Sequence, residues 1–121
     1  MIMEDSRKKL YSLENLEEIS AGSTDFIRQM LEMFMEQAYK TVEGFREGIE
    51  IRNYQLIRDL AHQIKPSIDN LKMDQLAQLI REVESEAEKE AEEQNLNPLI
   101  LETNSQLETV ISQLKKEIEG M

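Results

Sequence analysis

Apolar side chains recur at spacings of three, four and seven residues along several long segments of this sequence. That period places them on one face of an α-helix. It predicts helices over residues 24–50 and 54–71, a third beginning near Met73, and a last one with Asn97 as its N-cap and Pro98 at its first position. Long amphipathic helices with short connections bury their apolar faces against one another. The sequence therefore predicts an all-α fold, an antiparallel up-down four-helix bundle.

The N-terminal part of the chain predicts an arm and a short helix. Residues 1–9 are polar and are expected to form a flexible arm, and residues 10–121 are expected to form one domain. Apolar residues spaced by three predict a short helix over residues 10–20, which would lie across one end of the bundle. Gly22 can adopt the left-handed conformation that ends a helix, and Ser23 is a good N-cap for the next one.

Composition excludes several classes of protein and site. The 121 residues suffice for one domain whose core needs no metal or disulfide. Because the chain has no cysteine, thiolate metal sites are excluded and a reducing compartment is expected. No apolar run approaches the roughly 20 residues that span a bilayer. We therefore expect a cytoplasmic protein. The net charge of −11 opposes binding to nucleic acid and to anionic lipid, so we expect neither kind of partner.

Segment 54–71 carries the only histidine of the sequence, His62. On a helical wheel the apolar side chains of this segment occupy an arc of roughly 140°, and His62 lies roughly 160° from the centre of that arc. A single histidine is more often packed or incidental than reactive, but this position points the imidazole at water. The residues on its side of the helix are Arg58, Asp59, Lys65, Pro66 and Asp69. The wheel thus predicts an accessible imidazole with basic neighbours.

Pro66 lies inside the same predicted helix. Proline removes the N–H that would bond the carbonyl four residues earlier, and that carbonyl belongs to His62. Local bending beside the histidine is therefore expected. Two interpretations stay open: the helix bends to wrap its neighbours, or the rigid proline ring shapes a docking surface close to the imidazole.

The run Ala-His-x-Ile-Lys-Pro-Ser-x-x-x-Leu at residues 61–71 resembles the phosphoacceptor box of histidine-containing phosphotransfer (HPt) domains, the four-helix bundles of multistep phosphorelays. In that family a histidine is followed three residues later by lysine, then by a small residue or proline, then by serine or alanine. Residues 16–23, followed by 26–27 and 31–34, resemble the family's entry helix and the start of its first long helix. The resemblance covers most of residues 11–119.

The resemblance implies a phosphorelay intermediate of two-component signalling. His62 would accept a phosphoryl group from a receiver-domain aspartate and pass it to another receiver, and Lys65 would balance the phosphoryl oxygens and steer an acidic partner pocket. Partner contacts would come from Arg58, Asp59, Pro66 and Asp69. The expected partners are receiver domains of a hybrid histidine kinase and of a response regulator, which also supply the Mg²⁺. The chain itself is expected to be a monomer without cofactor, metal or ATP site, and to be no enzyme on its own.

Two features do not follow directly from the resemblance. Many HPt domains have glycine where this chain has Lys72, which leaves the geometry of that turn open, with Asn70 as the candidate for any left-handed residue. Residues 82–93 are strongly acidic. We interpret them as a solvated helical face that extends past the core, in preference to a dedicated acidic docking site.

Three other interpretations compete with a phosphorelay protein. A carboxylate-bridged di-metal bundle needs two Glu-x-x-His pairs, whereas the one histidine here is preceded at that spacing by Asp59. A histidine-kinase dimerisation domain would have Glu-Leu-Arg-Thr-Pro after its histidine, which this sequence lacks. The serious rival is a helical adaptor or scaffold in which His62 is never phosphorylated. The sequence names neither the kinase nor the regulator, and it leaves open whether the chain acts alone or was cut from a hybrid kinase.

Overall fold

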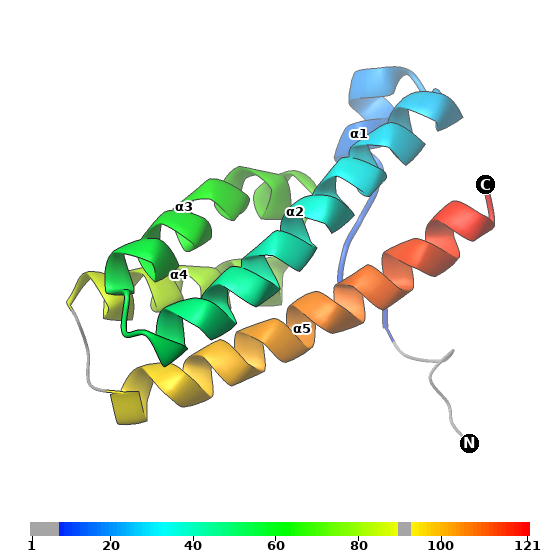
Figure 1. Ribbon diagram of the computed structural model, residues 1–121. Helices are drawn as coiled ribbons and strands as arrows, with labels where there is room; N and C mark the ends of the chain where they lie inside the picture. The colour runs from blue at the N-terminus through cyan, green and yellow to red at the C-terminus, as the bar shows by residue number, and fades with distance from the viewer. Residues whose placement is uncertain (1–7, 90–92) are drawn as a thin grey trace.

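The computed structural model describes residues 8–89 and 93–121, which form five α-helices and no strand (Figure 1). The helices are α1 (Glu14–Ser20), α2 (Thr24–Glu50), α3 (Tyr54–Asn70), α4 (Asp74–Glu88) and α5 (Glu93–Glu119). Most of the predicted arm lies outside the described residues. None of the helices in the described part of the chain is long and apolar enough to cross a membrane.

The four long helices form a closed ring in which each packs against two neighbours. α2 packs against α3, α3 against α4, α4 against α5, and α5 returns to α2. Successive helices run in opposite directions, and α1 lies against α2 at one end of the ring (Figure 1). The predicted antiparallel up-down bundle with a short helix across one end is confirmed.

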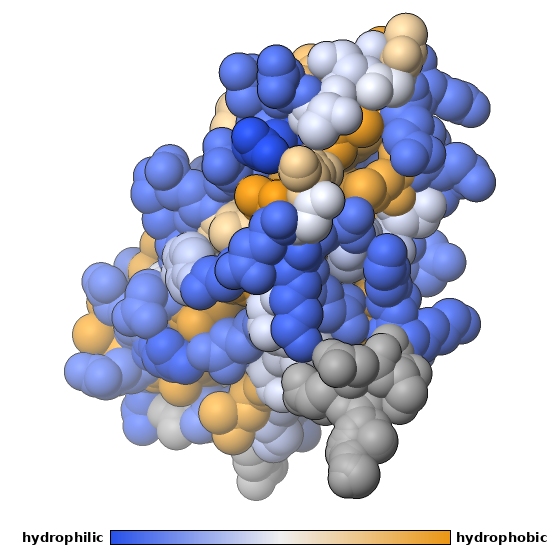
Figure 2. All heavy atoms as spheres, turned by 90° about the vertical axis from the view of Figure 1, so that its right-hand side faces the viewer, coloured by the Kyte–Doolittle hydropathy of each residue, from blue (hydrophilic) through white to orange (hydrophobic). Residues whose placement is uncertain are grey.

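The core is the shared apolar interior of this ring. Apolar side chains at helical spacing face inward from every long helix. The largest fully buried ones are Phe45, Leu31, Ile57, Ile64, Ile68, Met73, Leu76, Ile80, Leu96, Leu107, Leu114 and Val83. The outer surface is mostly hydrophilic on the face shown in Figure 2, where hydrophobic groups lie between charged side chains. Burial of the apolar stripes fixes the rotation of each helix and so decides which residues of α3 face water.

The residues before α1 form a strap, residues 9–13, that joins α5 to the turn between α3 and α4. Leu10 N donates to Gln113 Oε1 at 3.0 Å. Ser12 N donates to Leu71 O at 2.7 Å. Because these backbone groups bond to other elements, they are not available for a helical ladder. The first helix, α1, therefore begins at Glu14 and not at Leu10 as predicted.

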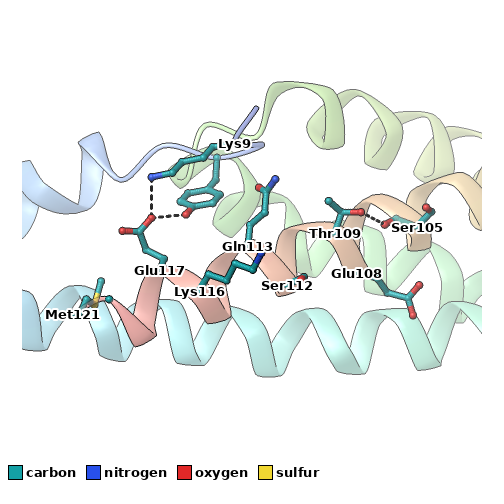
Figure 3. A pocket seen from close by; sticks show the side chains of 11 residues that line it. Lys9, Ser105, Glu108, Thr109, Ser112, Gln113, Lys116, Glu117 and Met121 are labelled. Carbon is teal, nitrogen blue, oxygen red and sulfur yellow. Dashed lines mark hydrogen bonds and ion pairs between the residues drawn. The ribbon is translucent and has the colours of Figure 1, made fainter. Parts of the chain in front are cut away.

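Tyr11 anchors this strap to α5. Its ring is buried, and its hydroxyl donates to Glu117 Oε1. The same carboxylate pairs with Lys9, whose Nζ lies 3.2 Å away (Figure 3). Burial, together with the hydrogen bond to Glu117, raises the pKa of the Tyr11 hydroxyl, so this group remains a hydrogen-bond donor.

The break between α1 and α2 agrees with the sequence. Gly22 has a φ of 83°, the left-handed conformation predicted for it. The Ser23 hydroxyl accepts a hydrogen bond from Phe26 N at 3.3 Å, which confirms it as the N-cap of α2.

Three helices end with a non-glycine residue in the left-handed conformation. These residues are Ala21, Arg52 and Lys72, with φ of 54°, 56° and 51°. At the end of α3, Met73 N donates to Ile68 O at 3.1 Å. Lys72 N donates to Asp69 O, also at 3.1 Å, and the two bonds together make a Schellman motif. Because this motif places its left-handed residue beyond the helix, the expectation that Asn70 would supply it is wrong: Lys72 does.

The last helix starts earlier than predicted. α5 already begins at Glu93, so Pro98 lies inside the helix and the predicted N-cap at Asn97 is wrong. Proline here removes one backbone hydrogen bond, to the carbonyl one turn earlier. Leu96 offsets that loss because its side chain is fully buried in the core. Burial of this one leucine therefore extends the helix upstream of the proline.

Two glycines of α2 lie where α3 approaches it closely. A Cβ at Gly48 would come within 2.5 Å of Ile57 Cγ1, which belongs to a fully buried side chain. A Cβ at Gly44 would come within 2.3 Å of Leu60 Cδ1, the free end of a partly buried side chain. Leu60 can therefore move aside from a Cβ at position 44, whereas Ile57 is packed on all sides and cannot move away from a Cβ at position 48.

We expect Gly48→Ala to destabilise the bundle by about 1–3 kcal/mol, because overpacking against Ile57 outweighs the gain in helix propensity. Gly44→Ala should be neutral or stabilising by up to about 1 kcal/mol, because Leu60 can turn away while the helix gains an alanine. Urea unfolding of both variants beside the wild type measures these free energies. Equal effects at the two positions would contradict the difference in packing.

Candidate functional site

α3 presents His62 to solvent. On either side of it, Ala61 and Ile64 are fully buried in the core, which fixes the rotation of the helix. The side chain of His62 is 72% exposed. The structure therefore places the imidazole on the face of the helix that the wheel predicted.

Glu84 of α4 joins His62 to Lys65. Its Oε2 lies 3.1 Å from His62 Nδ1, and its Oε1 accepts a hydrogen bond of 2.8 Å from Lys65 Nζ. Both α3 residues thus contact one carboxylate, each through a different oxygen. The Glu84 side chain is 22% exposed and that of Lys65 is 32% exposed, so the carboxylate forms the partly buried floor of a site whose imidazole projects outward.

The environment of Glu84 favours its charged form. The hydrogen bond from Lys65 contributes most and lowers the pKa of the Glu84 carboxyl below its usual value of 4.5, with a smaller contribution from His62. Partial burial acts in the opposite direction but does not outweigh these contacts. Near neutral pH this side chain is therefore a carboxylate, which accepts hydrogen bonds and donates none.

Arg58 and Asp59 lie one turn before His62 on α3. Both are held by Gln55: Arg58 Nη2 donates to Gln55 Oε1 at 2.7 Å, and Gln55 Nε2 donates to Asp59 Oδ1 at 2.8 Å. The glutamine thus links the two opposite charges and keeps them on the solvent side of the helix. These two of the four predicted partner-binding residues form a polar border to the site, and their side chains bond to Gln55 and not to the imidazole.

Pro66 and Asp69 border the site on its other side. α3 continues without interruption through Pro66 to Asn70, although the proline lacks a backbone donor. Pro66 is exposed, and with Asp69 and Asn15 it lines a shallow depression near the strap. Asp69 Oδ1 lies 4.0 Å from Arg81 Nη2 of α4, at the limit of an ion pair. All six predicted site residues therefore lie along the outer side of α3.

Glu84 is the site residue that sequence reasoning missed. It lies within the acidic stretch 82–93, which was interpreted as a solvated helical face, and its contact with α3 corrects that interpretation at this position. Residues 90–92 of the stretch lie outside the described residues. A signal was present: His62 and Glu84 are equally far from Met73, one before it and one after. In an antiparallel helix pair joined by a short turn, such residues lie opposite each other.

The chemistry available here is that of an accessible nitrogen nucleophile. A neutral imidazole offers one lone pair for attack, a lysine supplies positive charge nearby, and a carboxylate holds both in place. Among the described residues there is no group of three side chains with metal-binding chemistry. The site therefore consists of an exposed imidazole and its two charged neighbours.

We expect Glu84→Gln to lower the free energy of unfolding by about 1 kcal/mol near neutral pH, because the variant loses a partly buried ion pair. A lowered carboxyl pKa contributes stability above the usual value of 4.5, and this stability is lost as pH falls through the folded-state value. The variant and the wild type should therefore converge in acid. Thermal unfolding at a series of pH values tests this, with the exposed Glu82→Gln on the same helix as the matched control. A difference that stays constant through the acid range would contradict it.

Known proteins share both the sequence pattern and the fold. The sequence profile of the Hpt domain family matches residues 29–117, well over half of the chain. Among solved structures, the chain resembles histidine-containing phosphotransfer protein B (HptB) from Pseudomonas aeruginosa PAO1. The likeness has a TM-score of 0.81 and 19% sequence identity, and it covers 95% of this chain and 99% of that one. No curated protein matches the chain. An acceptor-like histidine on a bundle of this sequence and shape leads to one conclusion: the chain belongs to the Hpt domain family, whose members are phosphotransfer carriers of two-component signalling and not catalytic enzymes.

Proposed function

We propose that this chain is a phosphorelay intermediate in which His62 accepts a phosphoryl group from a receiver-domain aspartate and passes it to a second receiver. The observation that carries the proposal is the exposed imidazole of His62, held on an Hpt bundle with Lys65 and Glu84 beside it. The two partners would be receiver domains, one from a hybrid histidine kinase and one from a response regulator.

The transfer needs only a nucleophile and an acyl phosphate. In the neutral form of the imidazole, one ring nitrogen has a free lone pair. That lone pair attacks phosphorus, an N–P bond forms, and the P–O bond to the receiver's aspartate breaks, which returns an electron pair to the carboxylate. The second transfer runs the same events in reverse onto another carboxylate. The proposal assigns the Mg²⁺ to the receiver and no cofactor to this chain.

Lys65 is the proposed source of positive charge at the phosphoryl group. Phosphoryl transfer passes through a loose transition state, so positioning and charge neutralisation supply most of the catalysis. The Lys65 ammonium is held 2.8 Å from the carboxylate that also contacts His62. This shared partner keeps the cation close to the imidazole before any phosphate arrives. The same charge would attract the acidic pocket of a receiver.

The proposed docking surface is the outer side of α3. It carries Arg58, Asp59, Pro66 and Asp69 around the imidazole. The surface has few large apolar groups, which favours a small and transient interface. A relay protein needs such an interface because it must release each partner after transfer. A monomeric state agrees with this proposal, since one imidazole serves each partner in turn.

We expect the wild-type chain, incubated with a phosphorylated receiver domain, to gain an acid-labile and base-stable phosphate, and His62→Gln to gain none. The side chain is 72% exposed, so the substitution should change the free energy of unfolding by less than about 0.5 kcal/mol. Phosphate analysis after acid and base treatment, together with thermal unfolding, checks both statements. A wild-type chain that binds a receiver but never gains phosphate would favour the adaptor instead.

We expect Lys65→Glu to slow transfer from a receiver by at least about tenfold at low salt, because reversed charge weakens both docking and phosphoryl stabilisation. The loss should shrink as salt rises, since screening reduces both repulsions. Lys115→Glu makes the same change of charge on α5, across the bundle from α3, and is the matched control. Stopped-flow transfer rates over a salt series provide the measurement. Equal rates for Lys65→Glu and the control would remove Lys65 from the site.

A further inference from the structure

We propose that Gln37 of α2 is a positioning residue for the transfer: its side-chain amide holds the turn of α3 that Pro66 leaves one backbone hydrogen bond short, and so fixes the backbone that carries His62. This inference rests on the proposed role of His62 as the phosphoryl acceptor. It assigns to α2 a part that the phosphoacceptor box on α3 does not contain.

The first step is the hydrogen bond that α3 lacks. Proline has no backbone N–H, so Pro66 takes away the donor that would bond the carbonyl of His62 one turn earlier. The proline ring also crowds that same carbonyl. The turn that follows the acceptor residue therefore has one backbone hydrogen bond fewer than a regular helical turn, although α3 continues through it to Asn70.

The second step is a hydrogen bond that reaches this turn from α2. Gln37 Nε2 donates to the backbone carbonyl of Gln63 at 3.3 Å. Gln63 directly follows His62, and in the helical ladder its carbonyl is also the acceptor for the amide of Ser67. The side chain of Gln37 thus adds a donor to the carbonyl next to the one that loses its donor to the proline.

The third step is that both ends of this hydrogen bond belong to well-packed helices. On α2, Phe34 and Ala38 on either side of Gln37 are buried in the core, which fixes the direction of the glutamine side chain. The buried Thr41 donates its hydroxyl to the carbonyl of Gln37 at 2.9 Å and holds that backbone. On α3, Ile64 is fully buried beside the accepting carbonyl. The bond therefore joins two fixed backbones.

The place of the bond along the seam between α2 and α3 explains why it is needed there. In the first half of α3, two glycines of α2 let the helices approach closely. Further along, the seam opens into a groove of about 480 Å³, which Gln37, Gln63 and Ser67 line together with Met30 and Phe34. The hydrogen bond from Gln37 therefore spans the two helices where close packing gives way to this groove.

The consequence for transfer is the position of the acceptor nitrogen. Glu84 of α4 contacts the imidazole ring, whereas Gln37 acts on the peptide group next to it. A contact to the ring cannot hold a backbone that moves beneath it. Since the attacking atom must lie within a few tenths of an ångström of its productive position, a looser turn after His62 lowers the fraction of time spent in that geometry.

The test begins with amide hydrogen exchange in the unphosphorylated protein. Exchange at the amide of Ser67 reports opening of the turn that Gln37 holds. We expect Gln37→Met, which removes the donor, to raise this exchange rate about threefold or more, with the first two turns of α3 unchanged. Gln29→Met, at an exposed glutamine of the same helix, is the matched control and should leave the rate unchanged. In the Pro66→Ala background, which restores the missing N–H, Gln37→Met should raise it less than about twofold.

The second measurement is the rate of phosphoryl acceptance from a phosphorylated receiver domain at saturating concentration, where weaker docking does not lower the rate. We expect Gln37→Met to slow acceptance about threefold or more, with Gln29→Met unchanged. In the Pro66→Ala background the same substitution should slow it less than about twofold, whatever Pro66→Ala does alone. Thermal unfolding confirms that each variant is folded.

The outcomes separate positioning by Gln37 from a docking contact and from failure of the proposed function. Equal losses of rate with and without Pro66→Ala would show that Gln37 contacts the partner, and would overturn the inference. Unchanged exchange at Ser67 in Gln37→Met would overturn it as well. If the wild type gains phosphate and Gln37→Met gains it equally fast, this inference is wrong while the proposed function stands. If the wild type gains no phosphate, the proposed function itself fails, and the exchange measurement still decides whether Gln37 holds the turn.

Discussion

The antiparallel packing of α3 against α4 is the constraint on which the site depends. The two helices share a buried seam, and the turn of residues 71–73 between them is too short for one to slide along the other. The rotation of α3 turns His62 outward, and the register of the pair brings Glu84 opposite to it. One residue of slippage along α4 would carry the carboxylate about 100° around its helix and away from the imidazole.

A site built on two helices in this way is small, and its chemistry is correspondingly limited. In the proposed function, one nucleophile, one cation and one carboxylate hold the phosphoryl group, and the acyl phosphate and the receiving aspartate would come from other proteins. This division of parts is consistent with a carrier family. The net charge of −11 does not oppose the proposed function, because the local arrangement of charges around His62 matters more there than the total charge of the chain.

The parts of the molecule that sequence predicted are those set by local periodicity. The stripe on α3 and the cap at Ser23 could be read from residues within a turn or two of each other. Glu84, Pro98 and Lys72 could not, because each depends on a distant partner or on a terminating motif. Glu84 acquires its role only from the register of α4, and the helix passes Pro98 because Leu96 is buried. Lys72 is left-handed because the hydrogen bonds that close α3 require it, whatever the side chain.

The contact between Tyr11 and Glu117 brings the first and last segments of the described bundle to the same place. A domain whose two ends are adjacent can be inserted into a loop of another protein without stretching its backbone. The same closeness permits circular permutation, with new termini in the exposed turn of residues 51–53 at the far end of the bundle (Figure 1). In such a chain the strap would become an internal connection between α5 and α1. Helix α3 would keep all its neighbours, so the bundle could be placed inside a host chain as readily as at its end.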